Sequence, residues 1–279
     1  MPLAIVTGSN AGLGYQSARG LLRAGFQVVI TSRSQDRADL AASKLKLEFP
    51  ASVVFALELD LGRSASIDAF SGSFGAAFES WDVLVNNAGA KVLPGYRETD
   101  FGVEYHFGVN AVGHFAITAD LLPLRAKKAK IVSVSSIVAR FAPQQMGPAG
   151  SSQSYSAGAS YAASKLSNYL FAMELENRFG SEYFKSLAAH PGFARAEPYG
   201  PTSTRFFESF LAQSAQHGAQ PIIDAALNDQ LPGGSYRVPA VLELWGKPTS
   251  GKIPKLATSE NLKRNWEILE NLSGRKLVL

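Results

Sequence analysis

The chain of 279 residues contains no cysteine. This absence excludes disulfide bonds, thiolate nucleophiles and thiolate metal sites together. No apolar run approaches the roughly 18 residues of a membrane-spanning helix, and no basic leader or cleavage site precedes the first apolar run at 3–7. The sequence therefore predicts a soluble cytoplasmic protein with no integral membrane segment.

The excess of charge of one sign is also small, because 23 acidic residues nearly balance 27 basic ones and leave a formal net charge of +4. Basic residues gather at 125–130, which we interpret as a solvated helix end before a strand rather than a nucleic-acid patch. We expect no nucleic-acid partner. The four histidines lack the spacing of a His-x-x-x-His pair, so no metal is predicted.

Apolar runs rich in Val, Ile and Leu alternate with longer segments of helical period. Strands are expected near 3–7, 27–32, 53–59, 82–86, 130–135 and 185–190, and helices at 13–24, 36–48, 65–78, 101–125 and 159–179. This alternation predicts an α/β fold, a Rossmann-like doubly wound parallel sheet of about seven strands in three αβα layers. We expect a single domain over 1–279, with its dinucleotide-binding part roughly at 1–135 and its catalytic and substrate part roughly at 136–279.

Three segments lie outside that alternation. Residues 140–160 are rich in Gly, Ser, Gln and Pro, and residues 193–220 follow the sixth strand. We interpret both as substrate-side loops, the second partly helical; the alternatives are a plain surface insertion and a helix that packs its aromatic residues into the core. Residues 259–273 show the spacing of a closing core helix that ends at Gly274.

A glycine-rich turn, Thr-Gly-Ser-Asn-Ala-Gly-Leu-Gly at 7–14, joins the first strand to the first helix. Such a turn lets the backbone approach a phosphate while the helix N-terminus offers free N–H groups and a positive dipole end. The alternative is a turn that only connects the two elements. The predicted cofactor-binding residues here are Gly8, Asn10, Ala11, Gly12, Leu13 and Gly14.

Two further positions bear on a bound dinucleotide. The second strand ends in Ile-Thr-Ser-Arg, with Arg33 where an acidic residue would otherwise accept from a ribose 2'-hydroxyl. This favours NADP(H) over NAD(H), unless Arg33 only points into water. Asp60, with Leu61 beside it, follows the third strand and is placed to bond the adenine edge; helix capping is its alternative role.

Tyr161 and Lys165 are four residues apart on a predicted helix and therefore share a face. The lysine ammonium should favour the ionised phenol, so a group with an ordinary pKa of about 10 exchanges a proton near neutral pH. With the glycine turn, this pair indicates a nicotinamide-dependent carbonyl or alcohol enzyme. Tyr155 is a weaker candidate, since Ala159 stands where its lysine would be.

Six motifs occur in the order of a known family: the glycine turn, Asn-Asn-Ala-Gly at 86–89, Asn110, Val-Ser-Ser at 134–136, Tyr-Ala-Ala-Ser-Lys at 161–165 and Pro-Gly at 191–192. Over at least 3–192 the chain resembles the single-domain branch of the short-chain dehydrogenase/reductase family. Residues 161–175 and the Trp-Glu pair at 266–267 are similar to the retinol dehydrogenase-like and protochlorophyllide reductase-like subgroup.

The resemblance implies a role for each matching residue. Tyr161 would be the proton donor, Lys165 would bind the nicotinamide ribose and lower the tyrosine pKa, Ser136 would bond the carbonyl, and Asn110 would hold a water for reprotonation. Ser135 competes with Ser136, and the family pattern places the active hydroxyl on the second serine. Further implied cofactor contacts are Asn87, Ala88, Gly89, Asn110, Tyr161, Lys165, Pro191 and Gly192.

The implied function is NADPH-dependent reduction of a ketone or aldehyde on a hydrophobic small molecule, or the reverse alcohol oxidation. Two alternatives stay open: a catalytically silent NADP(H)-binding regulator, and a sugar-nucleotide epimerase or dehydratase. Ser136 and Tyr161 are 25 residues apart, so an insertion lies between them, and the threonine expected soon after Gly192 is missing. Relatives often form a homodimer through the helices starting near 101 and 159, a pairing that the insertion could hinder.

Overall fold

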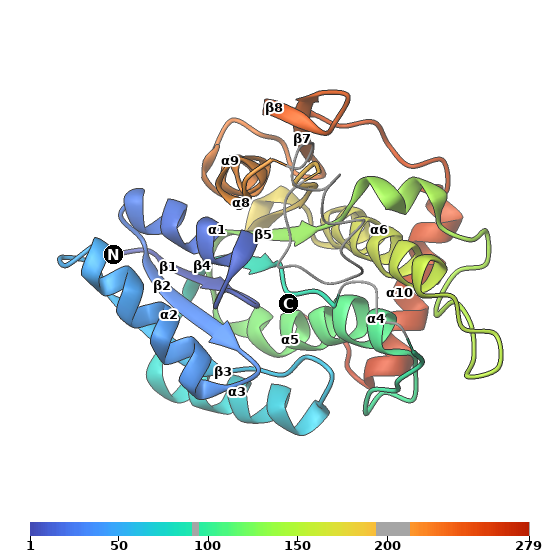
Figure 1. The fold of residues 1–279 in the computed structure, drawn as a ribbon, viewed down its shortest axis with the longest axis horizontal. Helices are drawn as coiled ribbons and strands as arrows, with labels where there is room; N and C mark the ends of the chain where they lie inside the picture. The colour runs from blue at the N-terminus through green and yellow to red at the C-terminus, as the bar shows by residue number, and fades with distance from the viewer. Residues whose placement is uncertain (91–94, 194–212, 279) are drawn as a thin grey trace, which may run out of the picture.

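The computed structural model describes residues 1–90, 95–193 and 213–278. Its centre is one eight-stranded sheet in the order β3-β2-β1-β4-β5-β6-β7-β8 (Figure 1). The strands are β1 (Leu3–Val6), β2 (Gln27–Ser32), β3 (Val54–Glu58), β4 (Trp81–Asn86), β5 (Arg125–Val134), β6 (Phe184–Ala189), β7 (Tyr236–Val241) and β8 (Trp245–Ser250). Each of β1 to β7 runs parallel to its neighbours, and β8 is antiparallel to β7.

Helices cover both faces of this sheet. They are α1 (Gly12–Arg23), α2 (Gln35–Glu48), α3 (Ser64–Ala77), α4 (Tyr105–Phe107), the π-helix η1 (Gly108–Val112), α5 (Gly113–Leu121), η2 (Leu122–Leu124), η3 (Ile137–Phe141), α6 (Ala157–Tyr183), α8 (Ala215–Gly218), α9 (Gln220–Leu227) and α10 (Ser259–Ser273). Alternate residues of β1 face opposite sides: Ala4 and Val6 pack in the core with α1, α2 and α9, whereas Leu3 and Ile5 pack in the core with α3, α5 and α6. The three-layer αβα prediction is confirmed.

Each strand and helix expected from periodicity is present, with bounds that mostly differ by one or two residues. Two differences have physical causes. The basic run at 125–130 is not a helix end but the first half of β5, where the largely buried Lys130 reaches Asp229 at 2.8 Å. The short antiparallel β8 was not expected, because its residues, Trp-Gly-Lys-Pro-Thr-Ser, carry little strand signal.

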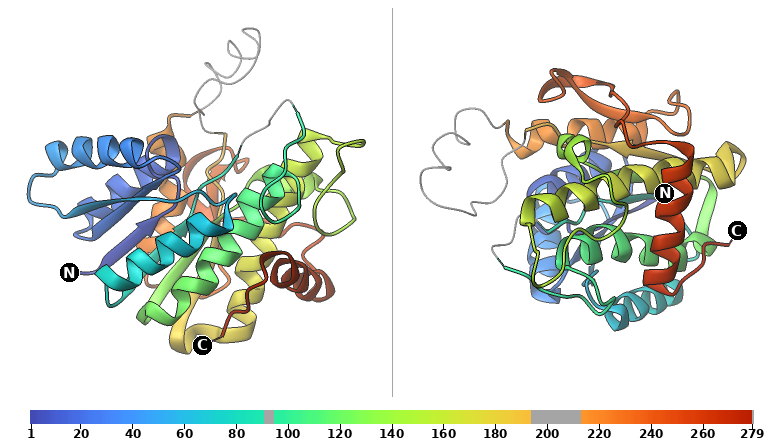
Figure 2. Two further views of the ribbon diagram at one scale, coloured as in Figure 1. Left: turned by 90° about the horizontal axis from the view of Figure 1, so that it is seen from below. Right: turned by 90° about the vertical axis from the view of Figure 1, so that its right-hand side faces the viewer.

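The closing helix α10 lies across α5 and α6 (Figure 2). Its Trp266 packs against Phe115 of α5 at 5.3 Å and Phe171 of α6 at 6.0 Å, measured between ring centroids. Gly274 ends the helix in a left-handed conformation, with φ of 66°. The expected core helix and its stop are both confirmed.

The stretch Tyr105–Leu124 is long and apolar enough to cross a membrane, but 83% of the window is buried inside the fold. The expectation that no apolar run approaches this length missed the stretch, because polar and small residues interrupt it in the sequence. The 142–156 segment has no regular structure, and its Met146 is buried in a core shared with α6 and α10. Of 193–220, the structure describes Phe193, α8 and the start of α9; residues 194–212 lie outside the described part.

Candidate active site

The predicted site residues follow the carboxyl ends of four neighbouring strands. The glycine turn follows β1, residues 87–89 follow β4, Ser135 and Ser136 follow β5, and residues 190–192 follow β6. Because these strands are parallel, their carboxyl ends lie at one edge of the sheet. The structure thus brings together segments that are far apart in sequence.

The glycine turn has the geometry that a phosphate group needs. Gly8 and Gly12 have φ of 61° and 58°, and a side chain on Gly14 would lie 2.4 Å from the Gly8 carbonyl oxygen. Asn10 and Ala11 occupy the same turn, and Leu13 lies in the first turn of α1. Ala11 begins the helix without a side-chain cap, so the first N–H groups of α1 remain for an anionic ligand. These residues fit a dinucleotide pyrophosphate.

Thr7 fastens this turn to the end of β4. Its Oγ1 accepts hydrogen bonds from the N–H groups of Asn87 and Ala88, both at 2.9 Å. The side-chain amide of Asn87 donates to the Thr7 carbonyl at 2.8 Å. Asn87 therefore supports the turn with its side chain, a role that its motif alone did not reveal.

The residues predicted to contact the adenosine half of the cofactor are Arg33, Asp60 and Leu61, and each makes a different kind of contact. Arg33 is exposed at the end of β2 and donates to the Tyr105 hydroxyl at 2.8 Å, so it does not merely point into water. Asp60 accepts from the Gly62 N–H at 3.0 Å, two residues on, whereas the residue that begins α3 as its N-cap is Arg63. Leu61 is buried in the core, and its carbonyl oxygen would lie 2.3 Å from a side chain on Gly113 of α5.

Asn110 lies within the π-helix η1, a local widening that often marks functional sites. Its Oδ1 accepts from the Ala90 N–H at 2.7 Å, and its Nδ2 donates to Ser164 at 3.0 Å. A methyl group on Gly89 would lie 3.5 Å from that Oδ1 and 3.4 Å from the Lys165 amine. Asn110, Gly89 and Lys165 thus border one space.

The two serines after β5 play different parts. Ser135 is buried and donates to the Lys165 carbonyl at 2.7 Å, which fixes α6 to β5. Ser136 interacts with the Tyr161 phenol through its side chain. The hydroxyl beside the tyrosine is therefore that of the second serine, as the resemblance implied.

Lys165 lies on the same side of α6 as Tyr161 and is 4% exposed. Its amine donates to the Val134 carbonyl at 3.0 Å and is 5.9 Å from the centre of the tyrosine ring. Burial raises the pKa of Tyr161, and only the Ser136 hydrogen bond opposes this. The expected lowering of the pKa by Lys165 is thus not found, because the amine is turned to a backbone carbonyl and does not offset the desolvation of the phenol.

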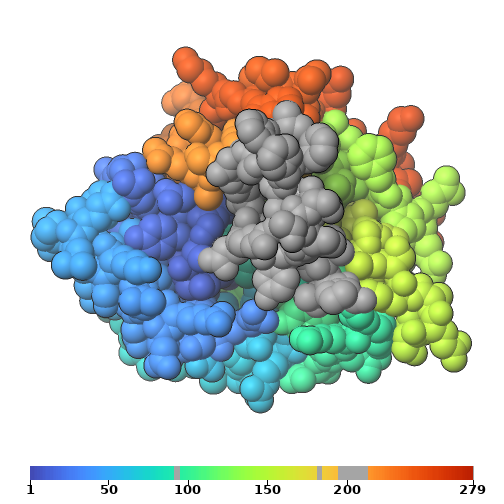
Figure 3. Space-filling model, viewed as in Figure 1, coloured from blue at the N-terminus to red at the C-terminus, as the bar shows by residue number. Residues whose placement is uncertain are grey.

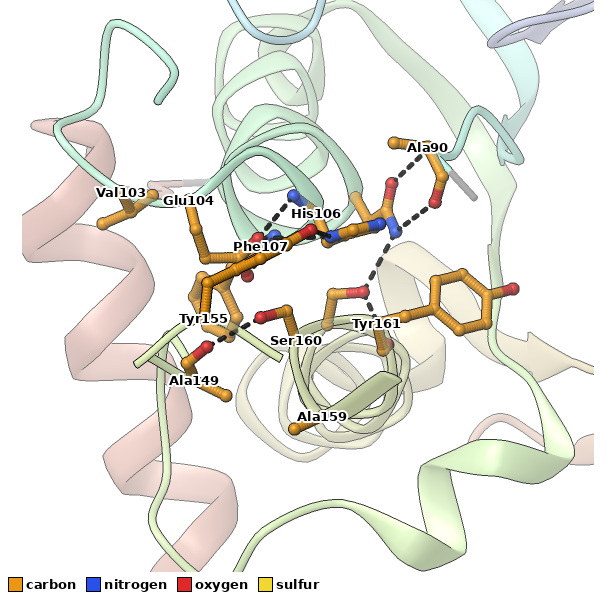
Figure 4. Close-up of polar contacts among 12 residues, drawn as sticks. Ala90, Val103, Glu104, His106, Phe107, Ala149, Tyr155, Ala159, Ser160 and Tyr161 are labelled. Carbon is orange, nitrogen blue, oxygen red and sulfur yellow. Dashed lines mark hydrogen bonds and ion pairs between the residues drawn. The ribbon is translucent and has the colours of Figure 1, made fainter. Parts of the chain in front are cut away.

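Three polar side chains lie behind Tyr161, and of these the sequence had drawn attention only to Tyr155. Glu104 accepts from the backbone N–H of His106 at 2.7 Å and lies 3.4 Å from its ring Nδ1; that nitrogen is 3.2 Å from the Tyr155 hydroxyl. The His106 ring meets the Tyr161 ring edge to face at 6.1 Å. Figure 4 shows the Tyr161 hydroxyl pointing away from His106 and Tyr155.

A second histidine connects the two sides of the site. His114 is buried, and its ring nitrogens lie 2.9 Å from the Thr7 hydroxyl and 2.8 Å from the Asn110 carbonyl. Burial lowers its pKa to about 3, so the ring is neutral at physiological pH. The sequence offered one sign of this contact: His114 lies four residues after Asn110, and residues i and i+4 share a helix face.

The edge after β6 is shaped by Pro191 and Gly192. Gly192 has φ of 75°, and a side chain there would lie 2.4 Å from the Leu244 carbonyl oxygen in the β7–β8 turn. The Pro191 carbonyl accepts from Gln213 at 2.7 Å. Among the described residues, no group of three or more His, Asp or Glu side chains could hold a metal ion.

Comparison with known proteins agrees with this arrangement. Residues 2–200 match the family model described as short chain dehydrogenase. The chain is 32% identical to human retinol dehydrogenase 12 over 97% of its own length and 85% of that protein, and 34% identical to mouse polyprenol dehydrogenase over 94% and 83%. A crystal structure of an uncharacterised protein from Mycobacterium paratuberculosis superposes with a TM-score of 0.83 at 30% identity, over 100% of this chain and 96% of that one.

The fold and these similarities support a retinol dehydrogenase-like position within the family. Enzymes of this family are oxidoreductases that bind a nicotinamide cofactor, for which the glycine turn and the space beside Gly89 are suited. The chain belongs to the short chain dehydrogenase family.

Proposed function

We propose that this protein is an NADP(H)-dependent enzyme that reduces a ketone or aldehyde on a hydrophobic small molecule, or oxidises the corresponding alcohol. The observation that carries the proposal is the meeting of Ser136, Tyr161, Lys165 and Asn110 at the carboxyl ends of β4 and β5. A protein that only bound a nucleotide would not need a phenol and a serine hydroxyl beside each other.

In the proposed reaction, the Ser136 hydroxyl donates a hydrogen bond to the substrate oxygen and stabilises the negative charge that develops there. Tyr161 gives its proton to the same oxygen. Burial favours the neutral phenol, so the proton is in place at neutral pH. When bound, the nicotinamide cofactor supplies the hydride that reaches the carbonyl carbon.

Lys165 and Asn110 complete the proposed proton path. The Lys165 amine, now on the Val134 carbonyl, is near enough to the space beside Gly89 to bind a ribose hydroxyl there. Asn110 is held by Ala90 and Ser164, and in the proposal it positions the water that returns a proton to the phenol. His114 donates a ring N–H to the Asn110 carbonyl and stays neutral at physiological pH, so it is not the acid of the proposed path.

The preference for NADP(H) rests on Arg33, whose guanidinium can neutralise a 2'-phosphate and which follows a strand, β2, that contains no carboxylate. The proposed substrate class draws on two relatives named for retinol and polyprenol, both lipophilic alcohols. The proposed location is the cytoplasm, which suits a chain without cysteine.

We propose a monomer rather than the homodimer that the resemblance left possible. Relatives often pair through the helices that correspond to α5 and α6, and here Trp266 of α10 packs against both. Sedimentation equilibrium of the purified protein tests this, and a stable dimer would contradict it.

The decisive experiment follows NADPH and NADH consumption against retinoids, steroids, quinones and polyprenals. We expect turnover of one lipophilic class, with NADPH preferred. Tight NADPH binding without oxidation by any carbonyl in the panel would reject the enzyme and favour a silent regulator.

A further inference from the structure

The buried His114 ring contacts both sides of the candidate active site. It belongs to α5 and lies four residues after Asn110, and it is 1% exposed. Its Nε2 is 2.9 Å from the hydroxyl oxygen of Thr7, the first residue of the glycine turn, and its Nδ1 is 2.8 Å from the Asn110 carbonyl oxygen. Figure 3 shows the N-terminal segments, in blue, on the left of the molecule and the green segment around α4, which leads into η1, at the lower right. One side chain thus joins two separate parts of the fold.

The partners of His114 determine which ring nitrogen carries the proton. A carbonyl oxygen can only accept a hydrogen bond, so Nδ1 carries the proton and donates it to Asn110. Burial lowers the pKa of His114 to about 3, so the ring is neutral and Nε2 carries no proton. Nε2 therefore accepts, and the Thr7 hydroxyl donates to it. The ring has one donor and one acceptor, and each has a defined partner.

This assignment also uses every hydrogen-bonding site of the Thr7 hydroxyl, which has one proton and two lone pairs. The proton goes to His114, and the lone pairs accept the N–H groups of Asn87 and Ala88, both at 2.9 Å. A second acceptor for the proton, the Val85 carbonyl, lies farther away at 3.3 Å. His114 therefore sets the direction of the hydroxyl that holds the segment after β4 against the glycine turn.

The Asn110 side chain is held by its own set of hydrogen bonds. Its Oδ1 accepts from the Ala90 N–H at 2.7 Å, and its Nδ2 donates to the Ala90 carbonyl at 3.2 Å and to the Ser164 hydroxyl at 3.0 Å. Both amide protons are therefore in use, and the side chain keeps one lone pair of Oδ1 for a water. The place of that lone pair depends on the backbone of Asn110, to which His114 is bonded.

We propose that His114 is a positioning residue that couples nucleotide binding at the glycine turn to the placement of Asn110, through a ring whose proton lies on Nδ1. A nucleotide that orders the glycine turn and residues 87–88 also orders the Thr7 hydroxyl, and the His114 ring passes this order to the Asn110 backbone through contiguous hydrogen bonds. The effect on proton return rests on the proposed function, whereas the position of the ring proton and the coupling do not.

Two substitutions separate the two hydrogen bonds of the ring. The amide nitrogen of His114→Asn can take the place of Nδ1, and the amide oxygen of His114→Gln can take the place of Nε2. We expect His114→Asn to bind NADPH roughly fivefold more weakly with kcat nearly unchanged. His114→Gln should instead keep the NADPH affinity and lower kcat roughly fivefold, the usual value of one hydrogen bond. His114→Phe should show both losses. Titration calorimetry with NADPH and steady-state rates measure them.

Thr118→Val is the matched control. Thr118 is buried on α5, four residues after His114, and accepts from the Asn86 side-chain amide at 3.0 Å. The substitution removes one buried hydrogen bond, so it should lower the melting temperature as the His114 variants do and change neither NADPH affinity nor kcat. If affinity and kcat fall together in all three His114 variants, or fall equally in Thr118→Val, the role of His114 is only structural and the proposal is overturned.

Two further measurements do not depend on turnover. Nitrogen-15 NMR of the imidazole should find the His114 proton on Nδ1, and a proton on Nε2 would overturn the proposal. At saturating NADPH, the Ala90 amide, which donates to Asn110, should exchange its hydrogen more slowly in the wild type. This slowing should be at least threefold smaller in His114→Phe, and equal slowing would contradict the coupling. If both results are as expected but the wild type reduces no carbonyl, the proposed function fails and the coupling stands.

Discussion

At one edge of the sheet, the cofactor side and the substrate side are held by different kinds of contact. Thr7 and Asn87 join β1 to β4 through partly buried hydrogen bonds to backbone groups, and the glycine turn presents backbone N–H groups. On the substrate side, Tyr161 depends on side chains: Ser136, and the ring of His106. Substitutions on the cofactor side should therefore weaken function by steric conflict, whereas substitutions on the substrate side should do so by removing a reacting or hydrogen-bonding group.

The largest effect expected is that of Tyr161→Phe. Removing the proton donor should lower kcat by roughly 10²- to 10⁴-fold, the usual contribution of a positioned acid, with NADPH affinity nearly unchanged. Tyr155→Phe is the matched control, since it removes a hydroxyl from a ring stacked on His106. We expect less than a tenfold change there. Steady-state rates and NADPH fluorescence titration make the comparison, and normal turnover by Tyr161→Phe would reject the proposed mechanism.

Gly14→Ala probes the cofactor side. The new methyl group would lie 2.4 Å from the Gly8 carbonyl oxygen and 2.5 Å from the Asn87 amide nitrogen. Overpacking of this kind costs about 1–3 kcal/mol, which corresponds to roughly 5- to 150-fold weaker binding when the turn must be reshaped.

Gly72→Ala in α3 is the control, because nothing lies within 4 Å of its new methyl group. It should leave cofactor binding unchanged and stabilise the helix by up to about 1 kcal/mol. Isothermal titration with NADPH measures both variants. Equal affinities would show that the turn does not approach the cofactor.

Acid should destabilise the fold through two buried histidines. Burial lowers the pKa of His190 to about 4 and that of His114 to about 3, whereas a free histidine titrates near 6.5. Between pH 6.5 and 4 the unfolded chain binds a proton at His190 that the folded chain does not. The stabilisation is thus complete above about 6.5 and lost as pH falls through about 4.

At pH 5 the loss from His190 is about 2 kcal/mol. His190→Asn keeps an acceptor for the Gly192 N–H and should reduce this loss, whereas the exposed His217→Gln should not. Urea unfolding of each variant at pH 7.5 and at pH 5 measures this loss of stability. An unchanged pH dependence in His190→Asn would place the acid sensitivity elsewhere.

The contrast between the cofactor side and the substrate side also explains what the sequence could predict. Strands and helices follow from periodicity, and the cofactor side follows from glycines whose positive φ only glycine tolerates freely. The stack of Tyr155 and His106 brings together residues 49 apart, and no local pattern encodes such a contact. The raised pKa of Tyr161 also escaped prediction, because i and i+4 spacing fixes which face two residues share but not where a long lysine side chain turns. Long-range packing decides both.

The smallest effect expected concerns the contact between Arg33 and Tyr105, which crosses from β2 to α4. Arg33→Gln removes the charge offered to a 2'-phosphate and should raise the KM for NADPH about tenfold, the value of one exposed charge-assisted hydrogen bond, with little change for NADH. Tyr105→Phe keeps the charge and removes the hydroxyl that holds the guanidinium. It should shift the preference for NADPH over NADH in the same direction but by a smaller amount. Without the Tyr105 hydroxyl, the solvated Arg33 side chain can still reach the phosphate, but it loses more conformational entropy when it does so. If Tyr105→Phe changes both cofactors equally, the contact supports α4 rather than the cofactor side, and the two sides of the site are coupled less closely than this hydrogen bond indicates.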